Sequence, residues 1–354
     1  MEQLAKVRTL MSQLGLDGVL LGTRANFAWV TGGKQNYVAN GTEKGEAYVY
    51  ITDNAKYAVA SSIEMPRIMD EELGPLGYEP LEFPWHEGIG AGRFASLIRH
   101  KRIGVDCGVL HGEGIVDISR ELSETRSVLS PAEQELYRTV ARETSAVIEQ
   151  VCRRVQPGWT EQQIRAETAR EAHLRGLNPT VILIATDERV FKYRHPIATD
   201  KKLERYAMIV ICAERYGLVA SSTRFVHFGP LPKELEEKAG KVAYVDAGMI
   251  AGTKAGISYR EYFDTVRKLY AEVGYPDEWK WHHQGGPAGY ATREFTVTPS
   301  TEGVMREGMS FAWNPSIAGT KSEDTILLTA GGVEIISQTG DWPCVEIEYD
   351  GKVW

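Results

Sequence analysis

The stretch that decides the fold covers residues 319–337 and reads Gly-Thr-Lys-Ser-Glu-Asp-Thr-Ile-Leu-Leu-Thr-Ala-Gly-Gly-Val-Glu-Ile-Ile-Ser. Within it, Lys321 shortly precedes an acidic pair that begins at Glu323. Two upstream stretches belong to the same pattern: Trp-His-His-Gln-Gly-Gly-Pro-Ala-Gly-Tyr at 281–290 and Phe-Ala-Trp-Asn-Pro at 311–315. Histidine, carboxylate and amide side chains therefore gather in the last third of the chain, where we expect the functional site.

These stretches resemble the C-terminal signature of the pita-bread hydrolases, which include Xaa-Pro peptidases, methionine aminopeptidases and creatinase. Pro157–Ile164 resembles the segment that joins the first two helices of these domains. Asn26–Gly32 resembles a pattern of the creatinase and prolidase N-terminal domains, with Trp29 at a tyrosine position. The resemblance implies an α+β protein with a creatinase-type α/β domain at 1–125 and a pita-bread domain at 126–354. It also implies a homodimer.

Local patterns agree with this division. Helix and strand patterns alternate to about residue 109, which is typical of an α/β domain. Ser130 to Glu133 is a capping box with Pro131 at the first helical position, so a helix is expected to begin there. We expect the face of this helix that packs inward to carry five residues: Leu136, Val140, Val147, Val151 and Val155.

Composition limits the classes of function. The chain has 354 residues, and its net charge of -8 argues against a nucleic-acid partner, which usually needs a basic face. No apolar run approaches the roughly 18 residues of a membrane span, so no membrane association is expected. The four cysteines form no Cys-x-x-Cys pair. They fit a reducing cytoplasm and argue against a structural zinc site.

The metal-dependent members of the resembled family hold two metal ions with five ligands. The resemblance places the ligand positions at Val210, Ser221, Gly286, Asn314 and Glu323. Valine and glycine offer no donor side chain, and serine is a poor ligand for a hard dication. Because only Glu323 is a carboxylate, we expect no two-metal centre and no other cofactor.

A Val-Asp-x-Gly motif at 245–248, away from the expected ligand positions, spells the start of the family's metal-binding pattern. Eleven residues after Asp246 stands Ile257 rather than aspartate, and no Thr-Arg pair follows. We therefore interpret Asp246 as a helix cap or surface residue.

The candidate catalytic residues are His195, Glu323 and Glu294. His195 lies in a segment that resembles the family's His-x-x-Pro-Thr-Asp, with the proline moved next to the histidine. An imidazole titrates near neutral pH, so His195 is the candidate general acid and base. The two glutamates would orient a cationic or amide group of the substrate.

The candidate substrate-binding residues are Arg224, His282, Asn314, His227 and Lys321. Arg224 could clamp an anionic group, and a cation could also pair internally with Glu323 in place of metal charge. Because neighbouring residues of an extended strand point to opposite faces, at most one of the adjacent histidines at 282 and 283 should face the pocket, and we favour His282. The aromatic residues around these motifs are interpreted first as core, with an apolar pocket wall as the alternative: Trp279, Trp281, Tyr290 and Trp313.

These patterns predict a metal-independent, creatinase-like hydrolase that cleaves a C–N bond in a small molecule or short peptide. A non-catalytic protein that binds peptides or partners through the same fold is the alternative. A metal-dependent Xaa-Pro peptidase is a third possibility, against which the ligand positions argue. The substrate itself is not predictable from the sequence.

Overall fold

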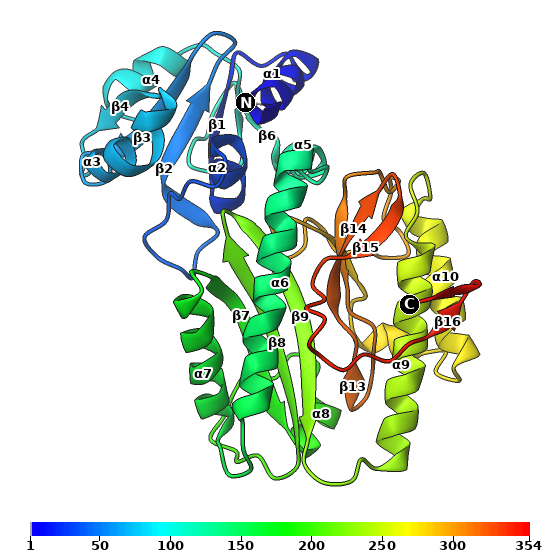
Figure 1. Ribbon diagram of the computed structural model, residues 1–354. Helices are drawn as coiled ribbons and strands as arrows, with labels where there is room; N and C mark the ends of the chain where they lie inside the picture. Colours follow the sequence, from blue (N-terminus) through cyan, green and yellow to red (C-terminus); the bar gives the residue numbers. More distant parts are fainter. Residues whose placement is uncertain (1) are drawn as a thin grey trace. The chain divides into compact units, whose positions relative to one another are not determined.

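The computed structural model describes residues 2–354, and the chain forms two compact units (Figure 1). The first consists of Met1–Arg126 with Tyr216–Leu218, and the second of Ser127–Arg215 with Val219–Trp354. The architecture is mixed α and β in both units. Among residues 2–354, no helix combines the length and the apolar character needed to cross a membrane.

The first unit is built on a six-stranded sheet with strand order β4-β3-β2-β1-β5-β6. The pair β1–β2 and the pair β2–β3 are antiparallel, whereas β3–β4, β1–β5 and β5–β6 are parallel. The strands are β1 (Gly18–Thr23), β2 (Lys44–Ile51), β3 (Lys56–Ser61), β4 (Glu79–Phe83), β5 (Ile103–Val105) and β6 (Ile115–Asp117). The helices are α1 (Glu2–Leu14), α2 (Arg24–Thr31), α3 (Met65–Arg67), η1 (Ile68–Leu73), η2 (Gly74–Leu76), α4 (Gly92–Ile98) and α5 (Ser119–Arg126).

Asp106 fixes the segment that resembles the creatinase and prolidase pattern. Its carboxylate accepts hydrogen bonds from the backbone of Gly22 at 2.8 Å, the hydroxyl of Thr23 at 2.6 Å and the amide of Asn26 at 2.8 Å. The amide oxygen of Asn26 accepts a further bond from the buried side chain of Arg126. The resemblance at this segment therefore reflects a buried polar network that joins β1, α2 and α5.

The second unit repeats a theme of two helices beside a group of strands. Its strands form a sheet β7-β8-β9, a sheet β10-β11-β14-β15 and two short pairs, β12–β13 and β16–β17. The strands are β7 (Asn178–Thr186), β8 (Tyr206–Arg215), β9 (Leu218–His227), β10 (Gly285–Ala288), β11 (Ser310–Trp313), β12 (Ser316–Ile317), β13 (Thr320–Lys321), β14 (Asp324–Thr329), β15 (Gly332–Ile335), β16 (Glu348–Tyr349) and β17 (Lys352–Val353).

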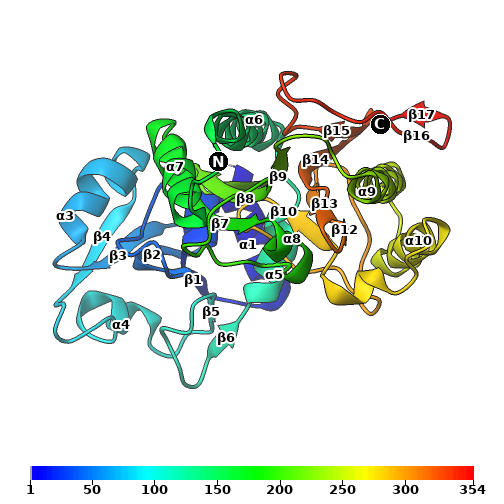
Figure 2. The ribbon, with the colours of Figure 1, turned by 90° about the horizontal axis from the view of Figure 1, so that it is seen from below.

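The helices of this unit are α6 (Pro131–Arg154), α7 (Glu161–Leu174), α8 (Glu188–Lys192), α9 (Lys233–Gly252), α10 (Tyr259–Glu272) and η3 (Glu278–Trp281). Helix α6 packs on β8 and α7 on β7, while α9 and α10 lie side by side and α9 contacts β12 and β13 (Figure 2). Capping boxes begin three of these helices, at Ser130, Thr160 and Ser258. In each, the cap side chain and the third helical residue satisfy backbone N–H groups that the helix leaves free.

The inward face of α6 differs from the expected one at a single position. Leu136 is 41% exposed, so its place in the predicted core is wrong. The neighbouring Tyr137 is buried instead, and its hydroxyl donates a hydrogen bond to the backbone oxygen of Val219 at 2.6 Å. A tyrosine whose hydroxyl finds a partner is a good core residue, which explains the difference.

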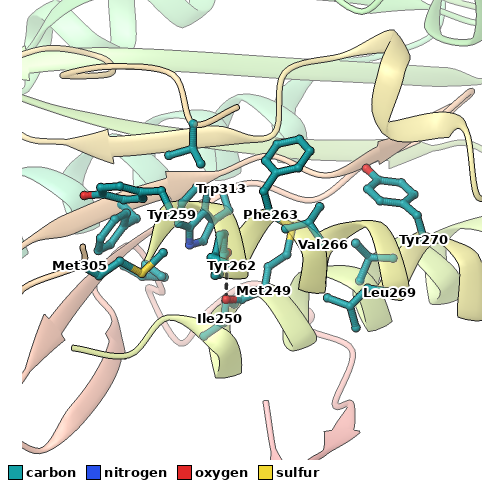
Figure 3. Close-up of a cluster of buried hydrophobic side chains, with 14 of the residues drawn as sticks. Met249, Ile250, Tyr259, Tyr262, Phe263, Val266, Leu269, Tyr270, Met305 and Trp313 are labelled. Carbon is teal, nitrogen blue, oxygen red and sulfur yellow. Dashed lines mark hydrogen bonds between the residues drawn. The ribbon is translucent and has the colours of Figure 1, made fainter. Parts of the chain in front are cut away.

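The core of the second half lies between α9, α10 and the strand β11 (Figure 3). The ring of Trp313 stacks on Tyr262 at 4.6 Å and on Phe311 at 5.1 Å between ring centroids. Its indole N–H donates to the hydroxyl of Thr253 at 2.9 Å. These contacts fix the end of β11, and the next residue is the buried Asn314.

Candidate functional site

The site begins on one face of the neighbouring strands β8 and β9. The hydroxyl of Ser221 donates to the thiol sulfur of Cys212 at 3.3 Å, so these side chains point to the same face. Thr223 is two residues further along β9 and shares that face. Its backbone N–H donates to the carbonyl of Glu323 at 3.1 Å, which places the start of β14 beside β9.

Glu323 is the centre of a buried ion cluster. Its carboxylate accepts hydrogen bonds from the hydroxyl of Thr223 at 2.7 Å, the ammonium of Lys321 at 2.8 Å and the guanidinium of Arg293 at 2.9 Å. Burial by itself opposes ionisation, but the charges of Lys321 and Arg293 prevail and lower the pKa of Glu323 to about 2. Glu323 is therefore an anion at neutral pH and is not the proton acceptor of the site.

Arg293 connects two of the five expected ligand positions. One guanidinium nitrogen donates to the hydroxyl of Ser221 at 3.1 Å, and another donates to Glu323 at 2.9 Å. Its side chain comes from the segment that follows β10. A cationic side chain thus lies at the place where two metal ligands would have to meet.

The remaining ligand positions also do not fit a two-metal centre. Val210 is buried in β8 and has no donor atom. A Cβ atom at Gly286 would lie 2.2 Å from the backbone oxygen of Phe295, so no side chain fits there without movement of the backbone. Asn314 is buried and offers an amide in place of a carboxylate. One carboxylate that is already paired with two cations cannot hold two dications.

Three histidines form a second group within the same unit. His195 follows α8, while His282 and His283 lie between η3 and β10. The Nε2 atoms of His195 and His282 are 3.1 Å apart, and the ring centroids of the three residues lie 4.6 to 5.6 Å from one another. The expectation that only one of the adjacent histidines faces the pocket is wrong, because they lie outside a regular strand and the alternation of strand side chains does not apply.

All three histidines line one cavity of about 440 Å³. Its other walls are formed by Arg194, Phe263, Trp279, Lys280, Trp281, Gln284, Thr296, Val297, Thr298 and Pro299. Trp281 is 72% exposed, so its interpretation as a core residue is wrong, whereas Trp313 and Tyr290 are buried. Aromatic and aliphatic side chains form part of its wall together with polar ones, as is usual for small-molecule sites.

Desolvation and the positive charges near the three histidines lower their pKa values and favour neutral rings. Partial burial and the Lys321 ammonium lower the pKa of His195. Burial and Lys321 lower the pKa of His282 to about 2, and desolvation by the surrounding chain and Arg293 lower the pKa of His283 to about 4. Each neutral imidazole has one protonated nitrogen and one lone pair. The group can therefore accept a proton, or share one between His195 and His282.

Three other predicted residues lie apart from the histidine group. The guanidinium of Arg224 pairs with Asp324 at 3.0 Å and Glu149 at 3.4 Å, and it lines a different cavity of about 500 Å³. The Nδ1 atom of His227 lies 3.2 Å from the backbone oxygen of Gly229 at the end of β9. The carboxylate of Glu294 accepts a hydrogen bond from the backbone of Tyr290.

Asp246 differs from its expected role as a helix cap or surface residue. It lies inside α9, is only 8% exposed, and accepts a hydrogen bond from the hydroxyl of Ser322 at 2.5 Å. Burial raises the pKa of Asp246 to about 7. Helical periodicity could have predicted this burial, because Val242, Val245 and Met249 lie on the same face of α9 and are buried.

Comparison with known proteins shows a matching family, a similar sequence and similar solved structures. Residues 135–336 match the model of metallopeptidase family M24. The Xaa-Pro dipeptidase of Pyrococcus horikoshii is 22% identical over 358 residues, with 96% of this chain and 97% of that protein covered. The crystal structure of a prolidase from the same organism superposes with a TM-score of 0.80 at 20% identity, covering 96% of this chain and 99% of that one. The N-terminal domain of FACT complex subunit SPT16 from chickpea has a TM-score of 0.69 at 12% identity, with 96% of each chain covered.

Proposed function

Because the chain belongs to metallopeptidase family M24 and has the pita-bread fold, we propose that it is a hydrolase that works without the two metal ions of that family. The bond cleaved is a C–N bond of a small molecule or short peptide, as in creatinase. The observation that carries this proposal is the position of Arg293, whose guanidinium joins Ser221 to Glu323. The similarity to Xaa-Pro dipeptidases supports hydrolysis of an amide bond, and the donor set argues against the metals.

The electrostatics of the ion cluster support a metal-free site. Glu323 contributes one negative charge, and Lys321 and Arg293 contribute two positive charges. With the imidazoles neutral, the cluster carries a net positive charge. Such a cluster repels a dication but stabilises negative charge that develops on a carbonyl oxygen during attack at carbon. The two cations therefore take the electrostatic role that metals have elsewhere in the family.

His195 is the proposed general acid and base. The ring nitrogen of His195 that does not contact His282 takes a proton from water as the water oxygen bonds to the carbonyl carbon, and the proton is then delivered to the leaving nitrogen as the C–N bond breaks. His282 lies 3.1 Å away and shares the proton while it is held on the imidazole pair. Asn314 and Glu323 transfer no proton in this proposal: both are buried, and the carboxylate of Glu323 is held by Lys321 and Arg293.

The cavity restricts the substrate to a small molecule or short peptide. A volume of about 440 Å³ accommodates a dipeptide or a small amide, urea or guanidino compound rather than a folded protein. Phe263 and Val297 offer an apolar wall, so a substrate with an apolar side chain is favoured. We also propose that the protein acts as a homodimer in the cytoplasm, which light scattering of the purified protein and cell fractionation would test.

A turnover assay tests the proposal. The protein is screened with dipeptides, including Xaa-Pro peptides, and with small amides, ureas and guanidino compounds in a buffer that contains a strong chelator. We expect turnover that the chelator does not reduce and that His195→Ala lowers by about 10²–10⁴-fold. The matched control is His173→Ala, because His173 is exposed on α7. Full activity of His195→Ala would contradict the assignment of the base.

A non-catalytic binding protein is the second candidate. Its support is that a domain named as a subunit of a complex, SPT16 of FACT, has the same fold over 96% of this chain. A ligand found by binding assays separates the two candidates. A binding protein should keep its affinity in His195→Asn and show no turnover with any compound. The third candidate, a metal-dependent Xaa-Pro peptidase, requires that chelation abolishes activity and that manganese or cobalt restores it.

A further inference from the structure

We propose that His195, His282 and His283 form a binding site for one zinc ion, at residues other than the five ligand positions of the family. The Nε2 atoms of His195 and His282 are 3.1 Å apart. Each of the three rings offers a nitrogen within 4.8 Å of the other two. Two imidazole nitrogens on a tetrahedral zinc ion lie about 3.3 Å apart, because each Zn–N bond is about 2.0–2.1 Å long. The pair of His195 and His282 already has nearly this spacing.

The third ligand needs only a small movement. His282 is 7% exposed and is held in place, whereas the side chains of His195 and His283 are exposed. The exposed rings can therefore rotate about their side-chain bonds toward the buried one without disturbing the core. With three nitrogen ligands in place, the fourth position of a tetrahedral ion would face the cavity of about 440 Å³.

The donor set determines which ion is suitable. Three imidazoles without a carboxylate or a thiolate suit zinc, copper or nickel, and they are a poor set for magnesium, calcium or manganese. Lys321 and Arg293 act on the same rings with positive charge, which Glu323 only partly offsets. This surrounding charge weakens the binding of a dication. The zinc ion is accordingly bound reversibly rather than held as a permanent part of the fold.

Reversible zinc binding has a consequence for the proposed hydrolase. A nitrogen of His195 that coordinates zinc has no lone pair with which to take a proton from water. Zinc should therefore inhibit turnover. This consequence rests on the proposed function, whereas zinc binding itself rests only on the geometry of the three rings.

Direct zinc titration of the full-length protein tests the site. The protein is treated with chelator, desalted and titrated with zinc sulfate in competition with a zinc-sensitive dye. We expect one zinc ion per chain in the wild type. In His195→Ala and His283→Ala, we expect a loss of affinity larger than the roughly 10–100-fold that removal of an outer-shell partner causes. His173→Ala should bind zinc as the wild type does, and circular dichroism checks that each variant is folded.

Several outcomes would overturn the proposal. One is a wild type that binds no zinc in the titration. Another is unchanged affinity in both His195→Ala and His283→Ala. A third is zinc binding that Glu323→Gln removes and the histidine variants retain, which would assign the metal to the family framework and contradict the proposed function as well. Binding that both histidine variants abolish supports the site whether or not turnover is detected, so the two proposals fail separately.

Discussion

The guanidinium of Arg293 lies 2.9 Å from the carboxylate of Glu323, and both side chains are almost inaccessible to solvent. Lys321 binds the other carboxylate oxygen at 2.8 Å. Removal of the carboxylate would leave two buried cations close together without a counterion. Breaking a buried ion pair in this way is costly, because the remaining charge is neither solvated nor paired. The cluster is therefore a structural feature as well as an electrostatic one.

Glu323→Gln should lower the free energy of unfolding by about 3–5 kcal/mol. Urea denaturation of the purified variant measures this change. The matched control is Glu334→Gln, because Glu334 pairs with Arg138 at 2.8 Å on the surface. An exposed pair contributes only about 0–1 kcal/mol. Equal effects of the two substitutions would show that the buried cluster does not act as described.

Gly286→Ala should destabilise the fold by about 1–3 kcal/mol, because the new Cβ atom would be forced against the backbone oxygen of Phe295. Gly240→Ala is the control, since Gly240 lies within α9 with open space around it. That change should stabilise the protein by about 1 kcal/mol, because alanine favours a helix. Thermal and urea unfolding of the two variants give the comparison. A stable Gly286→Ala protein would mean that this position can hold a side chain after all.

Asp246 should make the stability of the protein depend on pH. Its pKa is raised from 3.8 to about 7 in the folded state, where Asp324 and Glu323 face it as anions and Arg224 as a cation. The folded chain therefore holds a proton that the unfolded chain releases. The contribution of the protonated Asp246 carboxyl to the free energy of unfolding is fully present below about pH 4. It is lost as the pH rises through about 7.

Asp246→Asn removes this dependence while the amide oxygen still accepts a hydrogen bond from Ser322. At pH 8 the variant should be more stable than the wild type by about 2–4 kcal/mol, and the difference should vanish toward pH 4. Urea unfolding of both proteins across this range measures it. A difference that stays constant with pH would contradict the assignment of the proton to Asp246.

His282→Gln should lower kcat more than it changes KM, because the proposed role of His282 is to share the proton on His195 rather than to bind substrate. We expect a loss of kcat of about 10-fold or more, smaller than the loss in His195→Ala. Steady-state kinetics on the best substrate measure both constants. A rise in KM with unchanged kcat would instead assign His282 to substrate binding.

The fold was predictable because its signature is distributed over many residues. Stretches 157–164, 281–290 and 319–337 each preserve glycines, prolines or caps whose backbone roles do not depend on the chemistry of the site. The internal pairing of Lys321 with Glu323, one of the alternatives that the sequence left open, is present at 2.8 Å. Such a pair can be predicted from the sequence, because its two residues are close along the chain.

The parts that sequence reasoning missed depend on tertiary contacts. His283 reaches the pocket because its segment is irregular, and irregular backbone has no periodicity to read. Asp246 was assigned from a motif, although its helical neighbours indicated a buried face. Arg224 is engaged by Asp324, which lies one hundred residues away. The sequence alone could not tell this pairing from a substrate contact.

The manganese content of the protein tests the central claim most directly. The wild type is dialysed against excess manganese and then against metal-free buffer, and elemental mass spectrometry counts the bound ions. Manganese prefers oxygen ligands, so the three histidines do not confuse the result. We expect essentially no bound manganese, because Arg293 and Lys321 already pair with Glu323. Two manganese ions per chain would contradict it and would make the protein a metal-dependent peptidase.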